Sequence, residues 1–283
     1  MSFRSSIVAV LTLATSAFAQ SKPALDLDVT YALAGDKELK LDLARPEGKG
    51  PFPCVVLFHG GGWRMGNKKD VRSWLPFLAR EGYVAVSVGY RLAPDATFPA
   101  PVEDAKTAVR FLRANADAYR IDKDRIAAMG WSAGGHLACM LGLTDPKCGF
   151  EGKECPAQSS RVQAVVDYFG PTDLAAFGKD ELAQKGMLAP FIGVKFGDNP
   201  AAHEKASPVK YVTKDAPPFL IFHGTKDWVV PIEQSRELAE KLKDFHVPVK
   251  LVEVPGEAHG WEGKANADST RETLKFLAER LKK

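Results

Sequence analysis

The feature that most constrains the fold is an alternation, after Pro46, of short apolar runs with stretches of helical periodicity. The apolar runs predict buried strands at residues 55–58, 83–88, 125–129, 162–168, 219–222 and 248–254. The stretches between and after them predict helices at about residues 70–80, 101–115, 132–143, 231–244 and 268–281. Strands that alternate with helices in this way form βαβ units, so we expect an α/β fold with a mostly parallel sheet and helices on both faces.

Two segments depart from this rhythm. Residues 28–33 and 38–44 alternate apolar and polar side chains around Gly35-Asp36, which predicts an antiparallel hairpin and brings the sheet to about eight strands. Residues 171–216 are rich in Gly, Pro and Ala without a clean apolar period. We expect them to form a small cap-like insertion over the strand ends, within one domain that spans residues 20–283.

The first residues of the chain differ in kind from the rest. Arg4 provides a positive charge, the residues up to Thr15 are mostly apolar, and Ala17-Phe18-Ala19 is a small-x-small cleavage signal. This pattern is typical of a secretory signal peptide, because a spanning helix needs about 20 apolar residues. Residues 1–19 are therefore predicted to be removed after Ala19, which gives a secreted or periplasmic protein without a membrane span.

Charge and cysteine usage narrow the class of protein further. The formal net charge is +3 and the basic residues are interspersed with acids, so nucleic acid is not an expected partner. Cys148 and Cys155 lie in a polar stretch, where a disulfide could close a surface loop of an exported protein. Cys54 and Cys139 lie among apolar residues and are expected to be buried. No Cys/His spacing suggests zinc, so we expect no metal and no organic cofactor.

The run Gly130-Trp131-Ser132-Ala133-Gly134 follows a predicted strand and opens a predicted helix. In that context the pattern GxSxG indicates a nucleophile elbow, a sharp turn that exposes the serine hydroxyl. A side chain at position 130 or 134 would collide with the neighbouring strand or helix, and the helix N-terminus favours negative charge beside the serine. Ser132 is therefore the candidate nucleophile.

A second motif, His59-Gly60-Gly61-Gly62-Trp63, comes directly after another predicted strand. Consecutive glycines leave backbone N–H groups unshielded, so those of Gly61 and Gly62 can join that of Ala133 in an oxyanion hole. A phosphate-binding loop is the alternative interpretation, but the Lys and Ser/Thr of the P-loop pattern are missing. Trp63 is a candidate wall of the substrate pocket, with ordinary core packing as its alternative.

The candidate base and acid lie in two later loops. His259 lies in a glycine-flanked loop after the last predicted strand, and Asp227 follows the strand at residues 219–222. Loops at the carboxyl ends of parallel strands gather at one edge of the sheet, and the chain order Ser, Asp, His is known for this kind of site. We therefore favour Asp227 as the acid and His259 as the base, with Asp173 as the alternative acid.

The remaining candidates have weaker signals. Trp228 follows Asp227 and is a second candidate substrate-binding residue, because aromatic rings suit sugar faces and phenolic acyl groups. Core packing is again its alternative. Among the other histidines, His59 and His136 are expected to support the glycine loop and the elbow, and His203 and His246 to lie on the surface.

These motifs resemble those of bacterial carboxylesterases of the α/β-hydrolase superfamily. The similar runs are residues 59–66 (HGGGWRMG), 90–94 (YRLAP), 98–100 (FPA), 130–136 (GWSAGGH), 169–173 (FGPTD) and 223–231 (HGTKDWVVP). The nearest group is the bifunctional feruloyl/acetylxylan esterases, related more distantly to hormone-sensitive-lipase-like esterases, whose DPLxD motif is absent here. The resemblance implies an α/β-hydrolase fold with Ser132, Asp227 and His259 as the triad and Gly61, Gly62 and Ala133 as oxyanion donors.

The expected function is a secreted serine carboxylic-ester hydrolase that acts through an acyl-enzyme. Its substrates are expected to be small-molecule esters or the acetyl, short-chain acyl or feruloyl esters of carbohydrates. An arylformamidase would use the same three residues on an amide. A dipeptidyl-type serine peptidase shares the GWSxGG elbow but usually carries a large propeller, for which this chain has no room. A non-catalytic binding protein of this fold would typically lose the serine or the histidine.

Overall fold

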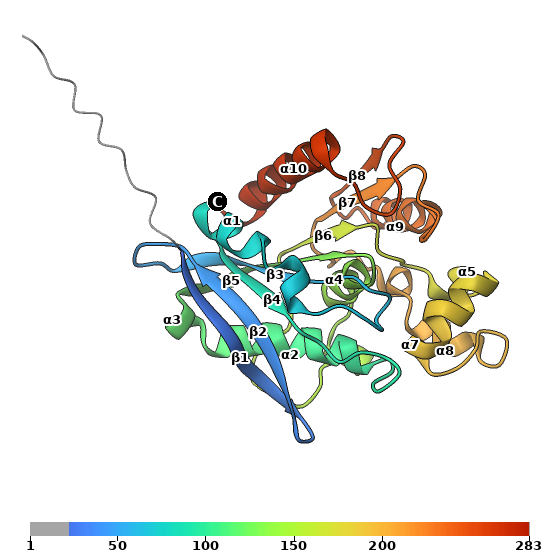
Figure 1. The fold of residues 1–283 in the computed structure, drawn as a ribbon, viewed down its shortest axis with the longest axis horizontal. Helices are drawn as coiled ribbons and strands as arrows, with labels where there is room; N and C mark the ends of the chain where they lie inside the picture. Colours follow the sequence, from blue (N-terminus) through green and yellow to red (C-terminus); the bar gives the residue numbers. More distant parts are fainter. Residues whose placement is uncertain (1–22, 283) are drawn as a thin grey trace, which may run out of the picture.

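The computed structural model describes residues 23–282, so the predicted signal peptide at residues 1–19 lies outside the described residues. Within residues 23–282, eight strands form one sheet in the order β1-β2-β4-β3-β5-β6-β7-β8 (Figure 1). The strands are β1 (Ala24–Ala34), β2 (Lys37–Arg45), β3 (Phe52–Phe58), β4 (Val84–Val88), β5 (Ile121–Trp131), β6 (Ala164–Tyr168), β7 (Phe219–Gly224) and β8 (Val249–Val254). The mostly parallel sheet of about eight strands is thus confirmed.

The antiparallel pairs lie together at one edge of the sheet. β1 pairs with β2 across the predicted hairpin, and β2 pairs with β4 in the antiparallel sense. The later pairs, from β3 with β4 to β7 with β8, are parallel. The parallel strands therefore end at the same edge, where the loops that follow β3, β5, β7 and β8 meet.

Helices cover both faces, and each face has its own core. Successive residues of β3 point to opposite sides, so Val56 packs in one core and Val55 in the other. On one face lie α1 (Trp74–Arg80) and α10 (Gly263–Leu281), and on the other lie α2 (Ala100–Ala114), α4 (Ala133–Leu143) and α9 (Glu233–Asp244) (Figure 1). No helix within residues 23–282 combines the length and the apolarity that a membrane crossing requires.

The predicted helix at residues 70–80 is split in the structure. Its first part is the short 3₁₀ turn η1 (Lys68–Val71), capped by the side chain of Asn67, and its second part is α1. Pro76 lies in the first turn of α1, where the missing N–H costs nothing because that group has no helical partner. The short helices α3 (Ala116–Tyr119) and η2 (Pro146–Cys148) complete the elements outside residues 171–216.

The predicted cap at residues 171–216 contains short helices beside the strand ends. They are α5 (Leu174–Phe177), α6 (Glu181–Ala183), the π-helical turn η3 (Gln184–Leu188), α7 (Ala189–Ile192), α8 (Pro200–Lys205) and the 3₁₀ turn η4 (Pro208–Tyr211). Figure 1 shows α5, α7 and α8 grouped at one end of the sheet. We refer to residues 171–216 as the cap segment.

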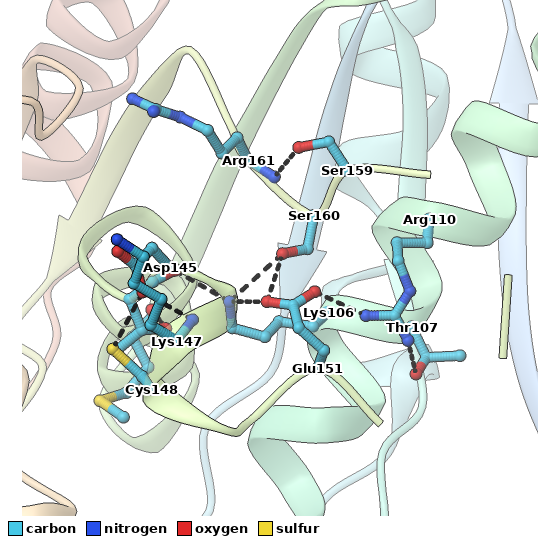
Figure 2. A network of polar contacts seen from close by, with 12 residues as sticks. Lys106, Thr107, Arg110, Asp145, Lys147, Cys148, Glu151, Ser159, Ser160 and Arg161 are labelled. Atoms are coloured by element: carbon cyan, nitrogen blue, oxygen red, sulfur yellow. Dashed lines mark hydrogen bonds and ion pairs between the residues drawn. The ribbon is translucent and has the colours of Figure 1, made fainter. Parts of the chain in front are cut away.

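The loop between η2 and β6 is held by charges rather than by a disulfide. Cys148 and Cys155 are both free, so the disulfide considered from the sequence is not formed. Glu151 instead accepts hydrogen bonds from two cations of α2, Lys106 Nζ at 2.6 Å and Arg110 at 2.8 Å (Figure 2). The sequence spacing of two cysteines does not show whether their thiols come close enough to bond. In the structure, the ion pairs of Glu151 hold the loop without a covalent link.

Candidate active site

Ser132 stands at the sharp turn between β5 and α4. Its φ of +54° lies in the left-handed region, and its N–H donates to the carbonyl of Tyr168 at 2.8 Å. A Cβ atom on Gly130 would collide with the carbonyl of Gly134, and one on Gly134 with the carbonyl of Phe58. The steric reason predicted for the two glycines is therefore confirmed, and the serine is held in a strained conformation of the kind found at functional sites.

A continuous chain of hydrogen bonds joins Ser132, His259 and Asp227. Nε2 of His259 lies 2.9 Å from Oγ of Ser132, and Nδ1 of His259 lies 2.7 Å from Oδ2 of Asp227. The three side chains come from the loops that follow β5, β8 and β7. Since Nδ1 faces a carboxylate, it carries the hydrogen, which leaves Nε2 to accept the serine hydrogen. This is the arrangement that a Ser-His-Asp triad requires.

Asp173, the alternative acid, is engaged elsewhere. It is the N-cap of α5, and its Oδ1 accepts hydrogen bonds from the N–H groups of Ala175 and Ala176 at 3.0 and 2.9 Å. An aspartate in this position satisfies N–H groups that have no helical partner. The structure therefore brings Asp227, and not Asp173, to His259.

The carboxylate of Asp227 is fully buried and hydrogen-bonded on both oxygens. Oδ1 accepts from the N–H groups of Val229 and Val230 at 2.8 and 2.9 Å, and Oδ2 lies 3.2 Å from Nε2 of His223 as well as beside His259. Burial by itself raises the pKa of Asp227. The hydrogen bonds from His223, His259 and Val230 outweigh that effect and hold the pKa well below its ordinary value. Asp227 is therefore ionised wherever His259 can act as a base.

The glycine loop after β3 lies beside the serine. A Cβ on Gly60 would be 3.4 Å from Cβ of Ser132. Within residues 23–282, the N–H groups of Gly61, Gly62 and Ala133 donate no backbone hydrogen bond, so they are free to meet a substrate oxygen. His59 supports this loop as expected, because its Nδ1 lies 2.7 Å from the carbonyl of Gly60 and its ring stacks on Tyr90.

Comparison with known proteins places this chain in a family. The model of the BD-FAE family matches residues 41–242. The chain belongs to the BD-FAE family. Solved structures confirm the α/β-hydrolase fold of this BD-FAE chain. A bifunctional GH43-CE protein of Bacteroides eggerthii superposes with a TM-score of 0.81 and 32% identity, over 90% of this chain and 38% of that one.

Two further comparisons extend this picture. A truncated carbohydrate esterase from gut microbiota superposes with a TM-score of 0.79 and 27% identity, over 93% of the BD-FAE chain and 98% of that structure. Esterase LipC of Mycobacterium tuberculosis is 34% identical over 216 residues, which are 75% of this chain and 54% of LipC. The BD-FAE chain therefore spans about half the length of the curated relatives it matches.

Trp63 does not line a substrate pocket, which corrects that prediction. Its side chain is only 1% exposed, its ring stacks on Phe191 at 4.2 Å, and its Nε1 donates to Nδ1 of His136 at 3.2 Å. Nε2 of His136 in turn lies 2.8 Å from the carbonyl of Ala206. The large indole is buried and its N–H is hydrogen-bonded, so Trp63 packs in the core, as the alternative interpretation held.

Trp228 has the opposite environment. It is 84% exposed directly after Asp227, so the core-packing alternative is wrong for this residue and its ring is open to a ligand.

The two histidines predicted to lie on the surface have different environments. His246 is exposed as predicted, but His203 in α8 is fully buried and not on the surface. Cys54 and Cys139 are buried as expected.

Two parts of the candidate site received no role from the sequence. The ring of Phe169, with a φ of +47°, lies 4.6 Å from the ring of His259 and so limits its rotation. In the cap segment, Met187 lies against the glycine loop, since a Cβ on Gly62 would be 3.2 Å from Cγ of Met187. Arg64 ties the two segments together by donating to the carbonyl of Gly186 at 2.6 Å. Only the position of Phe169 directly after a predicted strand offered a signal.

Proposed function

We propose that this BD-FAE chain is a carboxylic-ester hydrolase that uses Ser132 as nucleophile, His259 as base and Asp227 as the triad acid. The observation that carries the proposal is the hydrogen-bonded chain from Asp227 through His259 to Ser132, at 2.7 and 2.9 Å. An ester substrate is supported by the similarity to LipC, which is named an esterase, and to a structure described as a carbohydrate esterase.

The geometry accounts for a two-step acyl transfer. Nε2 of His259 removes the hydrogen of the Ser132 hydroxyl as Oγ attacks the ester carbonyl carbon. The carbonyl oxygen becomes negatively charged and is stabilised by the free N–H groups of Gly61, Gly62 and Ala133. Protonated His259 gives its hydrogen to the departing alcohol, which leaves the acyl group on Ser132. Water then attacks the acyl-enzyme by the same route and releases the acid.

Two features support an acylated carbohydrate as the substrate. Met187 of the cap segment lies directly against Gly62, which limits the space beside the oxyanion donors. The exposed ring of Trp228, next to the triad acid, can stack on a sugar face or on a phenolic acyl group. We therefore propose acetyl, short-chain acyl or feruloyl esters of carbohydrates as substrates. The signal-peptide pattern of residues 1–19 supports a secreted or periplasmic enzyme that acts on such esters outside the cytoplasm.

A labelling experiment with a fluorophosphonate probe tests the assignment of the nucleophile. The wild-type protein is expected to be labelled once, Ser132→Ala is expected to remain unlabelled, and Ser73→Ala, which changes an exposed serine at the start of α1, is expected to label as the wild type does. Absence of labelling in the folded wild-type protein, or equal labelling of Ser132→Ala, would overturn the proposal and favour a non-catalytic binding protein.

A hydrolysis panel tests the substrate class. Acetyl, butyryl, octanoyl and feruloyl esters, acetylated xylan and an N-formyl arylamine are compared by kcat/KM with the same preparation. Acetyl or feruloyl esters are expected to lead. A preference for octanoyl esters would contradict the proposed acyl groups and the carbohydrate assignment, and faster turnover of the formamide would replace the esterase assignment by an arylformamidase.

A further inference from the structure

His223 is a fully buried imidazole to which the mechanism above gives no part. It is near the end of β7, four residues before Asp227, and its side chain has no exposed surface. Buried polar groups are hydrogen-bonded in native proteins, so the partners of its two ring nitrogens report what holds the ring in place. These partners belong to the loop that carries Asp227 and to α9.

The contacts of His223 fix which nitrogen carries the hydrogen. Nε2 faces two acceptors, the carbonyl oxygen of Val230 at 2.9 Å and Oδ2 of Asp227 at 3.2 Å. Nδ1 lies 2.7 Å from the hydroxyl of Ser235 in α9. Because two acceptors surround Nε2, the hydrogen lies there, and Nδ1 accepts the hydrogen of the Ser235 hydroxyl. Ser235 is itself fully buried, so no water competes for this contact.

We propose that His223 is a positioning residue for the triad acid. Its Nε2–H, shared between the carbonyl of Val230 and Oδ2 of Asp227, holds Oδ2 in the orientation that meets His259, and the hydroxyl of Ser235 holds His223 in the tautomer that can donate. This inference rests on the proposed function, since it assigns a part within the same site. The sequence run HGTKD, residues 223–227, thus supplies both the acid and the donor that orients it.

The geometry of Asp227 explains why a second donor matters. The backbone of Val229 and Val230 engages only Oδ1, and rotation of the carboxylate about its Cβ–Cγ bond would carry Oδ2 away from His259. A donor from the β7 side gives Oδ2 two imidazole partners at once, which leaves a single orientation. The donor also disperses the negative charge of a carboxylate that has no exposed surface.

The other charged groups near His223 do not replace this contact. Asp167 on β6 is buried, and its Oδ1 accepts from the N–H of Gly170 at 2.9 Å. Glu253 on β8 pairs with His223 in the strand register, but its carboxylate is engaged by Arg236 at 2.8 and 2.9 Å. Asp227 is therefore the carboxylate among these that Nε2 of His223 contacts, at 3.2 Å, while the same nitrogen hydrogen-bonds the carbonyl of Val230 at 2.9 Å.

The test compares three variants with the wild-type chain. His223→Phe keeps a ring and removes the donor, His223→Gln keeps an amide donor near the position of Nε2, and Ser235→Ala removes the group that fixes the tautomer. The control is His203→Gln, which changes another buried histidine, in α8, that has no contact with Asp227. Active sites are first counted with the fluorophosphonate probe, so that an unfolded fraction does not enter kcat.

We expect His223→Phe to lower kcat on an acetyl ester by about tenfold to a hundredfold, as for the loss of one hydrogen bond to a charged group, with KM within about twofold. His223→Gln is expected to recover most of kcat, and Ser235→Ala to show a smaller loss in the same direction. The low-field proton NMR signal of the His259–Asp227 hydrogen bond is expected to shift or broaden in His223→Phe and to be unchanged in His203→Gln.

The inference is overturned if His223→Phe retains the wild-type kcat per titrated site and the same low-field signal. It is also overturned if His223→Gln is as impaired as His223→Phe, because the donor would then not be what matters. Failure of the proposed function has a different signature, namely a folded wild-type protein that neither binds the phosphonate nor hydrolyses any ester of the panel. The two results are thus distinguishable in one series of measurements.

Discussion

Met187 of the cap segment packs against Gly62 of the glycine loop. A Cβ on Gly62 would lie 3.2 Å from Cγ and 3.4 Å from Sδ of Met187, and Arg64 holds this part of the cap in place through the carbonyl of Gly186. The contact joins two segments more than a hundred residues apart in the sequence. It places a long, flexible apolar side chain beside one of the proposed oxyanion donors.

Shortening Met187 is therefore expected to widen the range of acyl groups. Met187→Ala should raise kcat/KM for butyryl relative to acetyl esters by about tenfold, the effect of one or two methylene groups in an apolar pocket. Leu182→Ala, which shortens an 84% exposed side chain elsewhere in the cap segment, serves as the control and should leave the ratio unchanged. An unchanged ratio in Met187→Ala would show that the acyl group does not reach this side chain.

Replacement of Asp227 separates the two candidate acids. Asp227→Asn keeps the size of the side chain but disturbs the tautomer of His259, so kcat is expected to fall about ten-thousandfold. Asp173→Ala should keep kcat within a few fold and lower the free energy of unfolding by about 1 kcal/mol, since it removes the cap of α5. The reverse pattern, with activity lost in Asp173→Ala, would contradict the assignment.

The ring of Phe169 is expected to contribute to the orientation of His259. It lies 4.6 Å from the imidazole and 5.3 Å from Trp261, so removing it leaves one face of the base without a neighbour. Phe169→Ala should lower kcat about twofold to tenfold, the range of a single aromatic contact. Steady-state kinetics on an acetyl ester measure this, with Phe245→Ala, an exposed ring at the C-terminal end of α9, as the control.

The network around Glu151 predicts a pH dependence of stability. Burial alone raises the pKa of Glu151, but hydrogen bonds and charge from Lys106, Ser160 and Arg110 lower it below its ordinary value of 4.5. A carboxyl whose pKa is lower in the folded state stabilises the fold above the unfolded pKa and loses that contribution as the pH falls through the folded value. Glu151 should therefore contribute fully near neutral pH and progressively less below about pH 4.5.

Glu151→Gln is the variant that measures this contribution. It leaves the fully buried Lys106 without its carboxylate partner, so the free energy of unfolding at pH 7 is expected to fall by about 3 kcal/mol. Thermal or urea unfolding between pH 3 and 7 should show the difference from the wild type shrinking toward acid. A difference that stays constant over this range would mean that ionised Glu151 is not the stabilising species.

Much of the site could be predicted because its chemistry is local in the chain. Gly130 and Gly134 flank Ser132 within five residues, and their reason is a steric conflict that the strand–turn–helix context already implies. The order Ser132, Asp227, His259 and the position of each after a strand place them at one edge of a parallel sheet. The structure brings those three together at 2.7 and 2.9 Å.

The sequence by itself therefore determined the α/β arrangement, the elbow and the loops that meet beside it, since periodicity and turn chemistry act over a few residues. Only the tertiary structure decided which neighbour of each motif faces the site. Trp63 and Trp228 both adjoin a site motif, yet the first is buried because Phe191 and His136 are packed against it, and the second stays largely exposed. The roles of Met187 and His223 likewise depend on contacts with other elements, the glycine loop for Met187 and α9 for His223, which a local sequence pattern does not predict. Asp173 caps α5, and only the structure shows that Asp227 is the acid that meets His259.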